Sequence, residues 1–203
     1  MRRSGVHIHP KSTPARVTQD KATKQLTLHT EDGAAHPEFD IILMAIGRSP
    51  MVGPLNLEAA GVSVGPKGHV LTDDLQNTNV GGVYALGDVV GKVELTPMAI
   101  AAGRRLSDRL FGGATTARAD YTNVPTVVFS HPVIGTCGLT EPEARKMYGE
   151  GNIRIYKSQF TNLFFGPWEI PPEDKQKTAM KVIVTGEEER VVGIHIIGMG
   201  ADE

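Results

Sequence analysis

After Asn123 the chain becomes a succession of short apolar runs divided by turn residues, and this pattern limits its fold more than any other feature. Apolar or alternating runs of this length, bounded by glycine, proline and polar residues, are typical of strands. A helix is expected at residues 141–148, directly after Thr140. The pattern predicts an antiparallel sheet with helical cover, an α+β arrangement. The expected strands are residues 126–129, 134–138, 153–160, 179–185 and 190–197.

The earlier part of the chain holds more scattered elements. Residues 15–20 and 25–30 are expected to form a hairpin around a polar turn. Residues 39–46 (FDIILMAI) are a near-continuous apolar run that ends at a glycine, which is typical of a strand covered on both faces. Residues 83–86 (VYAL) form another short apolar run of the same kind. These two runs predict buried strands of an α/β sheet.

Thr96 and Pro97 begin the clearest helix. Threonine is a good N-cap, and proline is tolerated at the first helical position because its missing N–H would be unpaired there anyway. No proline interrupts the segment up to Phe111, and Gly112-Gly113 then ends it. The start of such a helix offers free N–H groups and a partial positive charge to an anion, although most helix starts bind nothing.

Asp88 stands eight residues before this helix, at the end of an expected buried strand. Ligands of open α/β sheets bind beyond the carboxyl ends of the strands, and Gly87 would let the backbone approach one closely. An ionised carboxylate only accepts hydrogen bonds, so it suits the hydroxyl groups of a ribose or ribityl chain. The alternative is a turn-forming aspartate bonded to its own backbone.

Composition excludes several function classes. The 203 residues carry a net charge of -2, which gives no electrostatic argument for nucleic acid or an anionic membrane surface as a partner. No apolar run approaches the roughly 18 residues of a membrane span. Cys137 is the only cysteine, so the chain holds no internal disulfide and no redox pair, and a reducing compartment is expected. The histidines show no spacing typical of a metal site.

Four blocks of the sequence are distinctive: AIGRSP (45–50), GVYALGDVVGKVELTPMAIAAGRRL (82–106), NVPTVVFSHPVIGTCGLTE (123–141) and VVGIHIIG (191–198). Together they resemble the glutathione reductase branch of the flavin disulfide reductases. The blocks occur in the family's order, and the resemblance extends over nearly the whole chain. The resemblance implies an NADPH-dependent flavoprotein that reduces glutathione disulfide through FAD and a redox cysteine pair. It also implies a homodimer, with the cytosol or the mitochondrial matrix as its compartment.

The resemblance also implies site residues, none of them catalytic and none a metal ligand. Arg104 would bind a carboxylate of glutathione disulfide, since a guanidinium offers a fixed fork of donors. The alternative for Arg104 is a solvated helix face shared with Arg105 and Arg109. The implied FAD contacts are Gly87, Asp88, Leu95 and Thr96, and the implied NADPH contacts are Gly47, Arg48, Glu94 and Val127.

Other members of the family remain alternatives. Trypanothione reductases usually carry a small residue where this chain has Arg104, which favours glutathione as the substrate. Thioredoxin reductases have TVFTP where this chain has VVFSHP, but they share a cysteine at the position of Cys137. His131-Pro132 is interpreted as a structural turn, with a cis peptide bond as one form of it.

Much of the family's machinery is missing from these residues. No G-x-G-x-x-G motif occurs, and the family's redox cysteines and acid–base histidine have no counterpart. The simplest interpretation is a piece of a longer reductase: α/β nucleotide-binding remnants followed by an α+β antiparallel-sheet interface domain. Residues 1–50 would end the NADPH-binding domain, 51–121 would return to the FAD-binding domain, and 122–203 would begin the dimerisation domain. A non-catalytic binding or interface fragment is the alternative of another class.

Overall fold

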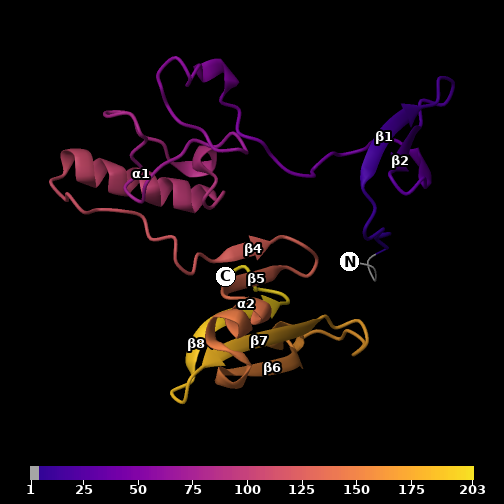
Figure 1. The fold of residues 1–203 in the computed structure, drawn as a ribbon. Helices are drawn as coiled ribbons and strands as arrows, with labels where there is room; N and C mark the ends of the chain where they lie inside the picture. The colour runs from indigo at the N-terminus through magenta and orange to yellow at the C-terminus, as the bar shows by residue number, and fades with distance from the viewer. Residues whose placement is uncertain (1–4) are drawn as a thin grey trace. The chain divides into compact units, whose positions relative to one another are not determined.

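The computed structural model describes residues 5–203 and divides the chain into two compact units, Met1–Pro50 and Met51–Glu203 (Figure 1). Each unit is built around an antiparallel sheet. Among the described residues, every pair of neighbouring strands is antiparallel.

The first unit is a three-stranded sheet in the order β1-β2-β3. The expected hairpin is confirmed, since β1 and β2 pair antiparallel. In its turn the Asp20 carboxylate accepts hydrogen bonds from the N–H groups of Ala22 at 2.9 Å and Thr23 at 2.7 Å. These bonds lower the pKa of Asp20 below its ordinary value. The strands are β1 (Pro14–Gln19), β2 (Leu26–Thr30) and β3 (Ala35–Phe39).

The strand expected at residues 39–46 is wrong. Only Phe39 belongs to a strand, and the apolar residues after it are exposed to solvent. The exposed fractions are 82% for Ile41, 86% for Leu43 and 75% for Ile46. The physical reason is that a run covered on both faces needs neighbouring strands, and residues 5–203 supply none to this run. The apolar composition therefore signals a surface that needs a partner.

Residues 51–121 are loop-rich and are organised around one long helix, α1 (Thr96–Phe111). The buried strand expected at residues 83–86 is also wrong. Tyr84 makes only an isolated bridge with Asn77, and both Val83 and Tyr84 are 36% exposed. Two short 3₁₀ helices, η2 (Gly53–Leu55) and η3 (Gly87–Val90), and a second bridge between Val64 and Val70 complete this part.

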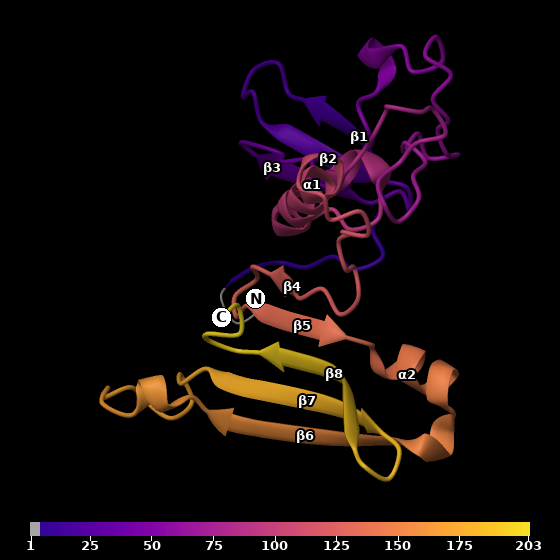
Figure 2. The same ribbon diagram turned by 90° about the vertical axis from the view of Figure 1, so that its left-hand side faces the viewer.

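The remaining residues form a five-stranded antiparallel sheet in the order β4-β5-β8-β7-β6 (Figure 2). The expected strands and helix of this region are confirmed with small shifts at their ends. They are β4 (Thr126–Val128), β5 (Ile134–Gly138), α2 (Glu141–Tyr148), η4 (Glu150–Asn152), β6 (Ile153–Thr161), β7 (Lys177–Thr185) and β8 (Arg190–Ile197).

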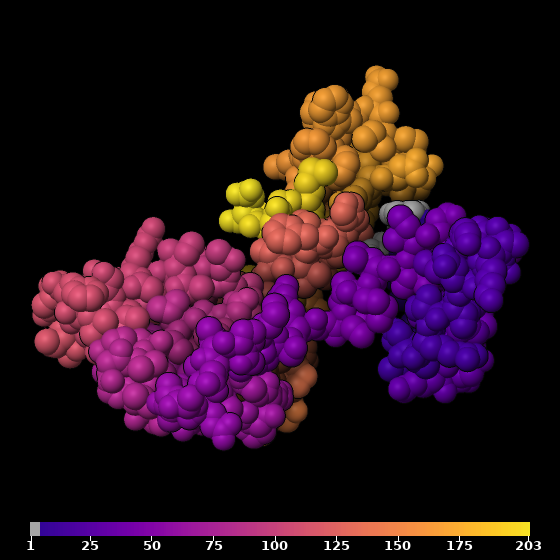
Figure 3. Space-filling view, turned by 90° about the horizontal axis from the view of Figure 1, so that it is seen from above, coloured from indigo at the N-terminus to yellow at the C-terminus, as the bar shows by residue number. Residues whose placement is uncertain are grey.

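Helix α2 packs on one face of this sheet and forms its core. A capping box begins the helix, since the Glu143 carboxylate accepts a hydrogen bond from the Thr140 N–H at 2.8 Å. Its buried face meets the sheet at Ala144, which packs with Ile153 and the fully buried Ile183. The segment between β6 and β7, which includes η5 (Leu163–Phe165), projects beyond the end of the sheet (orange in Figures 2 and 3).

Candidate functional site

Helix η3 packs against α1, and this contact brings the proposed FAD residues together. Gly87 is buried, and a Cβ on it would lie 3.2 Å from the Ala99 Cβ. Its φ of +75° is also one that favours glycine. Because Gly87 lies against Ala99, the next residue, Asp88, is held close to the start of α1.

The Asp88 carboxylate is exposed and accepts no hydrogen bond from any group in residues 5–203. Only its backbone carbonyl is used, as the acceptor for the Gly91 N–H at 3.0 Å. The turn-forming alternative required a bond between the carboxylate and nearby backbone, and the structure does not contain one. The carboxylate is therefore available to the hydroxyl groups of a ligand.

The N-terminus of α1 differs from the expected one by one residue. Leu95 is the N-cap, and Thr96 is already helical, so the expected capping role of Thr96 is wrong. The Leu95 carbonyl accepts hydrogen bonds from the N–H groups of Met98 and Ala99, both at 3.0 Å. Pro97 has no N–H. Within the described chain the N–H groups of Leu95 and Thr96 donate to no acceptor, so both remain for an anionic or carbonyl group.

These observations fit the flavin that the sequence resemblance implies. A glycine without a Cβ, an unbonded carboxylate and two unbonded N–H groups lie within ten consecutive residues, at one helix end. A carboxylate suits the hydroxyls of a ribityl chain, and paired N–H donors suit the oxygen and nitrogen acceptors of a pyrimidine ring. The chain thus offers one side of such a site.

The three arginines of α1 have three different environments. Arg109 donates from Nη2 to the Leu75 carbonyl at 2.6 Å and to the Asn77 side-chain oxygen at 2.9 Å, so it is structural. Arg105 pairs with Asp108 at 3.3 Å. Arg104 is exposed and, within residues 5–203, has no hydrogen-bond or ion-pair partner. The interpretation as a shared solvated face therefore does not describe Arg109.

Arg109 donates hydrogen bonds to a loop at Leu75 and Asn77. The conformation of this loop depends on an ionised Asp73 carboxylate. The carboxylate accepts hydrogen bonds from the Asn77 side chain at 2.8 Å and from the N–H groups of Asn77 at 2.9 Å and Leu75 at 2.8 Å. The bond from the Asn77 side chain, and then those from the backbone, lower the pKa of Asp73 below the ordinary 3.8.

The loop around Asp73 is expected to loosen in acid. A depressed pKa contributes stability that is complete above the ordinary value and is lost as the pH falls through the lower value of the folded state. An NMR titration of the Asp73 carboxyl carbon, with the Arg109 Nε–H followed in parallel, measures both events. In Asp73→Asn the Arg109 signal should be perturbed already at neutral pH. An ordinary pKa for Asp73 would contradict the expectation.

The proposed NADPH residues lie in several elements. Gly47, at φ +139°, and the exposed Arg48 follow the apolar run of the first unit. Val127 is on β4, paired with Gly135, and its side chain is half-buried. Glu94 is exposed and stands directly before the N-cap of α1, with Oε1 3.7 Å from Nε2 of His69.

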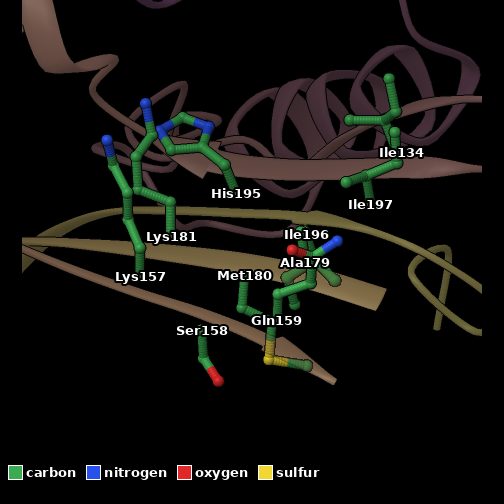
Figure 4. A pocket seen from close by; sticks show the side chains of 10 residues that line it. All are labelled: Ile134, Lys157, Ser158, Gln159, Ala179, Met180, Lys181, His195, Ile196 and Ile197. Atoms are coloured by element: carbon green, nitrogen blue, oxygen red, sulfur yellow. The ribbon is translucent and has the colours of Figure 1, made fainter. Parts of the chain in front are cut away.

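The five-stranded sheet carries a cavity of about 550 Å³ on the face that α2 covers in part (Figure 4). Lys157, Lys181 and His195 are cross-strand neighbours at one side of it, and Ile134, Ala179 and Ile197 line the other side. Lys181 reaches Glu141 of α2 at 3.5 Å, and His195 donates to the Leu139 carbonyl at 3.0 Å. No nucleophile with an adjacent base is present among these side chains.

Other features of the described residues carry no site. The Cys137 thiol donates to the Asn123 carbonyl at 3.1 Å. The His131-Pro132 peptide bond is cis, as the turn interpretation allowed. Within residues 5–203, no group of three or more histidine, cysteine or acidic residues is arranged to hold a metal ion. None of the helices in that range is long and apolar enough to cross a membrane.

The sequence did not reveal His69 and Lys92, which hold the segment between η3 and α1. Lys92 donates to the Asp73 carbonyl at 3.1 Å and pairs with Asp74 at 3.2 Å. Their partners are about twenty residues away in sequence, with no periodic pattern to link them. Gly91 gave no separate signal for its contact with His69, because its φ of +65° at the end of η3 already favours a glycine.

Residues 1–103 match the family described as "Pyridine nucleotide-disulphide oxidoreductase", and residues 124–203 match its dimerisation domain. The chain is 46% identical over 194 residues to the glutathione reductase of Schizosaccharomyces pombe, an alignment that covers 96% of this chain and 41% of that protein. The HOCl-induced flavoprotein disulfide reductase RclA of Escherichia coli has a similar structure, with a TM-score of 0.80 at 26% identity over 99% of this chain and 44% of RclA. Its Cu(II) complex gives a TM-score of 0.82 over 100% of this chain and 44% of that one.

The chain thus spans less than half the length of the relatives it matches. Its fold, with two antiparallel sheets, is that of the corresponding part of these proteins. Since the first family match extends over more than half of the chain, the protein belongs to the pyridine nucleotide-disulphide oxidoreductase family.

Proposed function

We propose that the chain is part of an NADPH-dependent glutathione-disulfide reductase, which maintains the cellular thiol balance. The observation that carries the proposal is the contact of η3 with α1, which leaves Asp88 and the N–H groups of Leu95 and Thr96 without partners in the described chain. The 46% identity to a glutathione reductase supports the choice of substrate.

The proposal assigns three tasks to the chain's own residues. The Asp88 carboxylate would accept hydrogen bonds from the ribityl and diphosphate part of FAD, with Gly87 allowing the close approach. The N–H groups of Leu95 and Thr96 would donate to the pyrimidine edge of the flavin. When bound, FAD would take a hydride from NADPH and pass the electrons to a disulfide of the longer protein. Gly47, Arg48, Glu94 and Val127 would contact NADPH.

Arg104 would bind the substrate. It is seven residues after Pro97, so it lies about two turns and about 10 Å along α1, on the same side of the helix as that proline. A guanidinium without a partner among residues 5–203 can form a charge-assisted pair with a carboxylate of glutathione disulfide. Trypanothione disulfide has a different charge, so this arginine favours glutathione disulfide as the substrate.

The proposed domain organisation has two supports. The chain divides into compact units at residues 50 and 51, where the end of the NADPH-binding domain was expected. The dimerisation-domain match begins at residue 124, two residues after the expected boundary. Residues 51–121 would then belong to the FAD-binding domain, and the five-stranded sheet to the domain that joins two subunits into a homodimer.

The proposed compartment is the cytoplasm, with the mitochondrial matrix as the second candidate. The support is the thiol chemistry of the chain, because its single cysteine is unpaired and its proposed reaction produces thiols. Fractionation of cells that express the whole protein tests the assignment.

The direct test uses the whole reading frame that contains these residues. The proposal expects a Cys-x4-Cys segment upstream and a His-Pro segment followed by a glutamate downstream. The purified protein should be yellow with bound FAD and should oxidise NADPH when glutathione disulfide is added, in preference to thioredoxin or trypanothione disulfide. A start and a stop codon that flank these 203 residues would support a non-catalytic interface module instead. A preference for thioredoxin would move the protein to another branch of the family.

A further inference from the structure

The segment between β6 and β7 carries an apolar tip, which consists of Leu163, Phe164 and Trp168. The segment projects beyond the end of the five-stranded sheet (Figures 2 and 3). Leu163 is 91% exposed, Trp168 53% and Phe164 51%, and the rings of the two aromatic residues lie 6.1 Å apart. Together these side chains expose on the order of 300 Å², and apolar patches of this size on a single chain are often functional.

The base of the segment holds the tip in a fixed position. The Asn162 side chain accepts a hydrogen bond from the Phe164 N–H at 2.9 Å and donates one to the Met199 carbonyl at 3.2 Å. Phe165 is buried, and its ring packs edge-on against that of Phe164, with the centroids 5.4 Å apart. The tip is therefore ordered before it meets any partner, so little conformational entropy is lost when it binds.

The composition of the tip is that of the centre of a protein interface. No residue from Ser158 to Trp168 is charged. The buried centres of such interfaces are depleted of charged residues and enriched in aromatic ones, and tryptophan is among their strongest anchors.

The charges that follow the tip favour a protein partner over a lipid surface. Aromatic segments that enter a membrane surface are accompanied by lysine and arginine, which attract anionic lipids. The first three charged residues after Trp168 are acidic, namely Glu169, Glu173 and Asp174. These carboxylates would be repelled by such a surface.

The family match indicates which protein the tip meets. Residues 124–203 match the dimerisation domain of the family, and the tip lies inside this range. In a dimer with two-fold symmetry the same surface of each subunit is used, so the interface needs no third protein. A second copy of the chain is therefore the occupant that the observations favour.

We propose that the apolar tip is an anchor of the subunit interface, where Leu163, Phe164 and Trp168 are buried against the second copy of the chain. The proposal rests on the homodimer of the function proposed above and adds the residues that hold it together. Trp168 is the central residue, because it is the largest side chain of the tip.

Removal of the tip should weaken the dimer of the whole protein. In the double variant Leu163→Ser, Trp168→Ser the dissociation constant of the dimer should rise at least about 30-fold, the effect of one lost interface anchor. Sedimentation velocity over a dilution series measures this constant. Both side chains are more than half exposed in the single chain, so the circular dichroism spectrum should not change. A native protein that sediments as a monomer, or a variant dimer as tight as the native one, would overturn the proposal.

Phe111 provides the matched control. It is also aromatic and is 86% exposed, but it lies outside the dimerisation-domain match. Phe111→Ser should therefore leave the dissociation constant of the dimer as it is. An equal weakening by this substitution would show that the effect is not specific to the tip and would count against the proposal.

Photo-crosslinking identifies the partner directly. With p-benzoylphenylalanine in place of Phe164 in the whole protein, irradiation should join two subunits and give a band of twice the subunit mass on a denaturing gel. The same amino acid in place of Phe111 should give no such band. Cross-links from position 164 only to lipid, or only to another protein, would refute the assignment to a second copy.

The dimer and the chemistry can fail separately. A whole protein that dimerises through the tip but holds no FAD would refute the proposed reductase function and support the tip as an anchor. A yellow and active protein whose dimer is indifferent to the tip substitutions would refute the anchor alone.

Discussion

Arg104→Ala is expected to lower kcat/KM for glutathione disulfide by roughly 10- to 150-fold in the whole reductase. The range corresponds to the loss of a charge-assisted hydrogen-bonded pair, about 1.5–3 kcal/mol. Reduction of the flavin by NADPH should stay nearly unchanged, because Arg104 lies about two turns into α1 and makes no bond that positions the N-terminus of the helix. Steady-state kinetics with glutathione disulfide and stopped-flow reduction with NADPH measure the two half-reactions separately.

The neighbouring arginine provides the matched control. Arg105 has the same charge and helix, but it pairs with Asp108 at 3.3 Å. Arg105→Ala should therefore change neither half-reaction appreciably, since an exposed pair of this kind contributes little. An equal loss in both half-reactions for Arg104→Ala, or an equal effect of the two substitutions, would refute the substrate-binding role.

The second prediction with a large effect concerns FAD binding and activity of the 203-residue chain when it is purified alone. The purified 203 residues should hold no stoichiometric FAD and should not oxidise NADPH with glutathione disulfide. In the proposed function, Asp88 and the two N–H groups supply only one side of a flavin site, and the chain spans 41% of the glutathione reductase it resembles. The exposed run with Ile41, Leu43 and Ile46 also shows that partner surfaces are required.

Absorbance at the flavin wavelengths after gel filtration, and NADPH consumption with excess FAD present, test this expectation. The whole protein, purified in parallel, serves as the positive control. A yellow and active preparation of the 203 residues would overturn the expectation and would place the complete flavin site within this chain.

The sheet of the last eighty residues could be read from the sequence because its signals are local. Each strand between Ile134 and Ile197 has its own run and its own turn, and each strand pairs within the same block. The helix at Glu141–Tyr148 also carries its start signal in its own sequence, as the Thr140–Glu143 capping box. Local signals and local partners together make such a prediction succeed.

The two wrong strands failed for the opposite reason. The runs at residues 39–46 and 83–86 have the composition of strands that are buried on both faces, yet no strand of the described chain lies beside them. Composition reports what environment a segment needs, and pairing decides whether the strand forms. A sequence pattern alone does not say where the partner comes from.

The candidate site was predictable in part for a similar reason. Gly87, Asp88, Leu95 and Thr96 form a contiguous motif, and the structure gathers them at one helix end. The supports of that motif are distant in sequence. Arg109 binds residues more than thirty positions earlier, and His69 packs on Gly91, so neither role has a local sequence signal.

The bonds of Arg109 also determine which substitutions the loop before η3 can tolerate. At position 75 the arginine binds a backbone carbonyl, which any amino acid provides, so the side chain there can vary freely. Position 77 supplies a side-chain oxygen to Arg109 and a side-chain N–H to Asp73, so it should accept asparagine but neither aspartate nor alanine. Position 76 has a φ of +63° and is 2% exposed, and it should reject β-branched residues. The bonds that orient α1 thus leave position 75 free to vary, restrict position 76 sterically and restrict position 77 chemically.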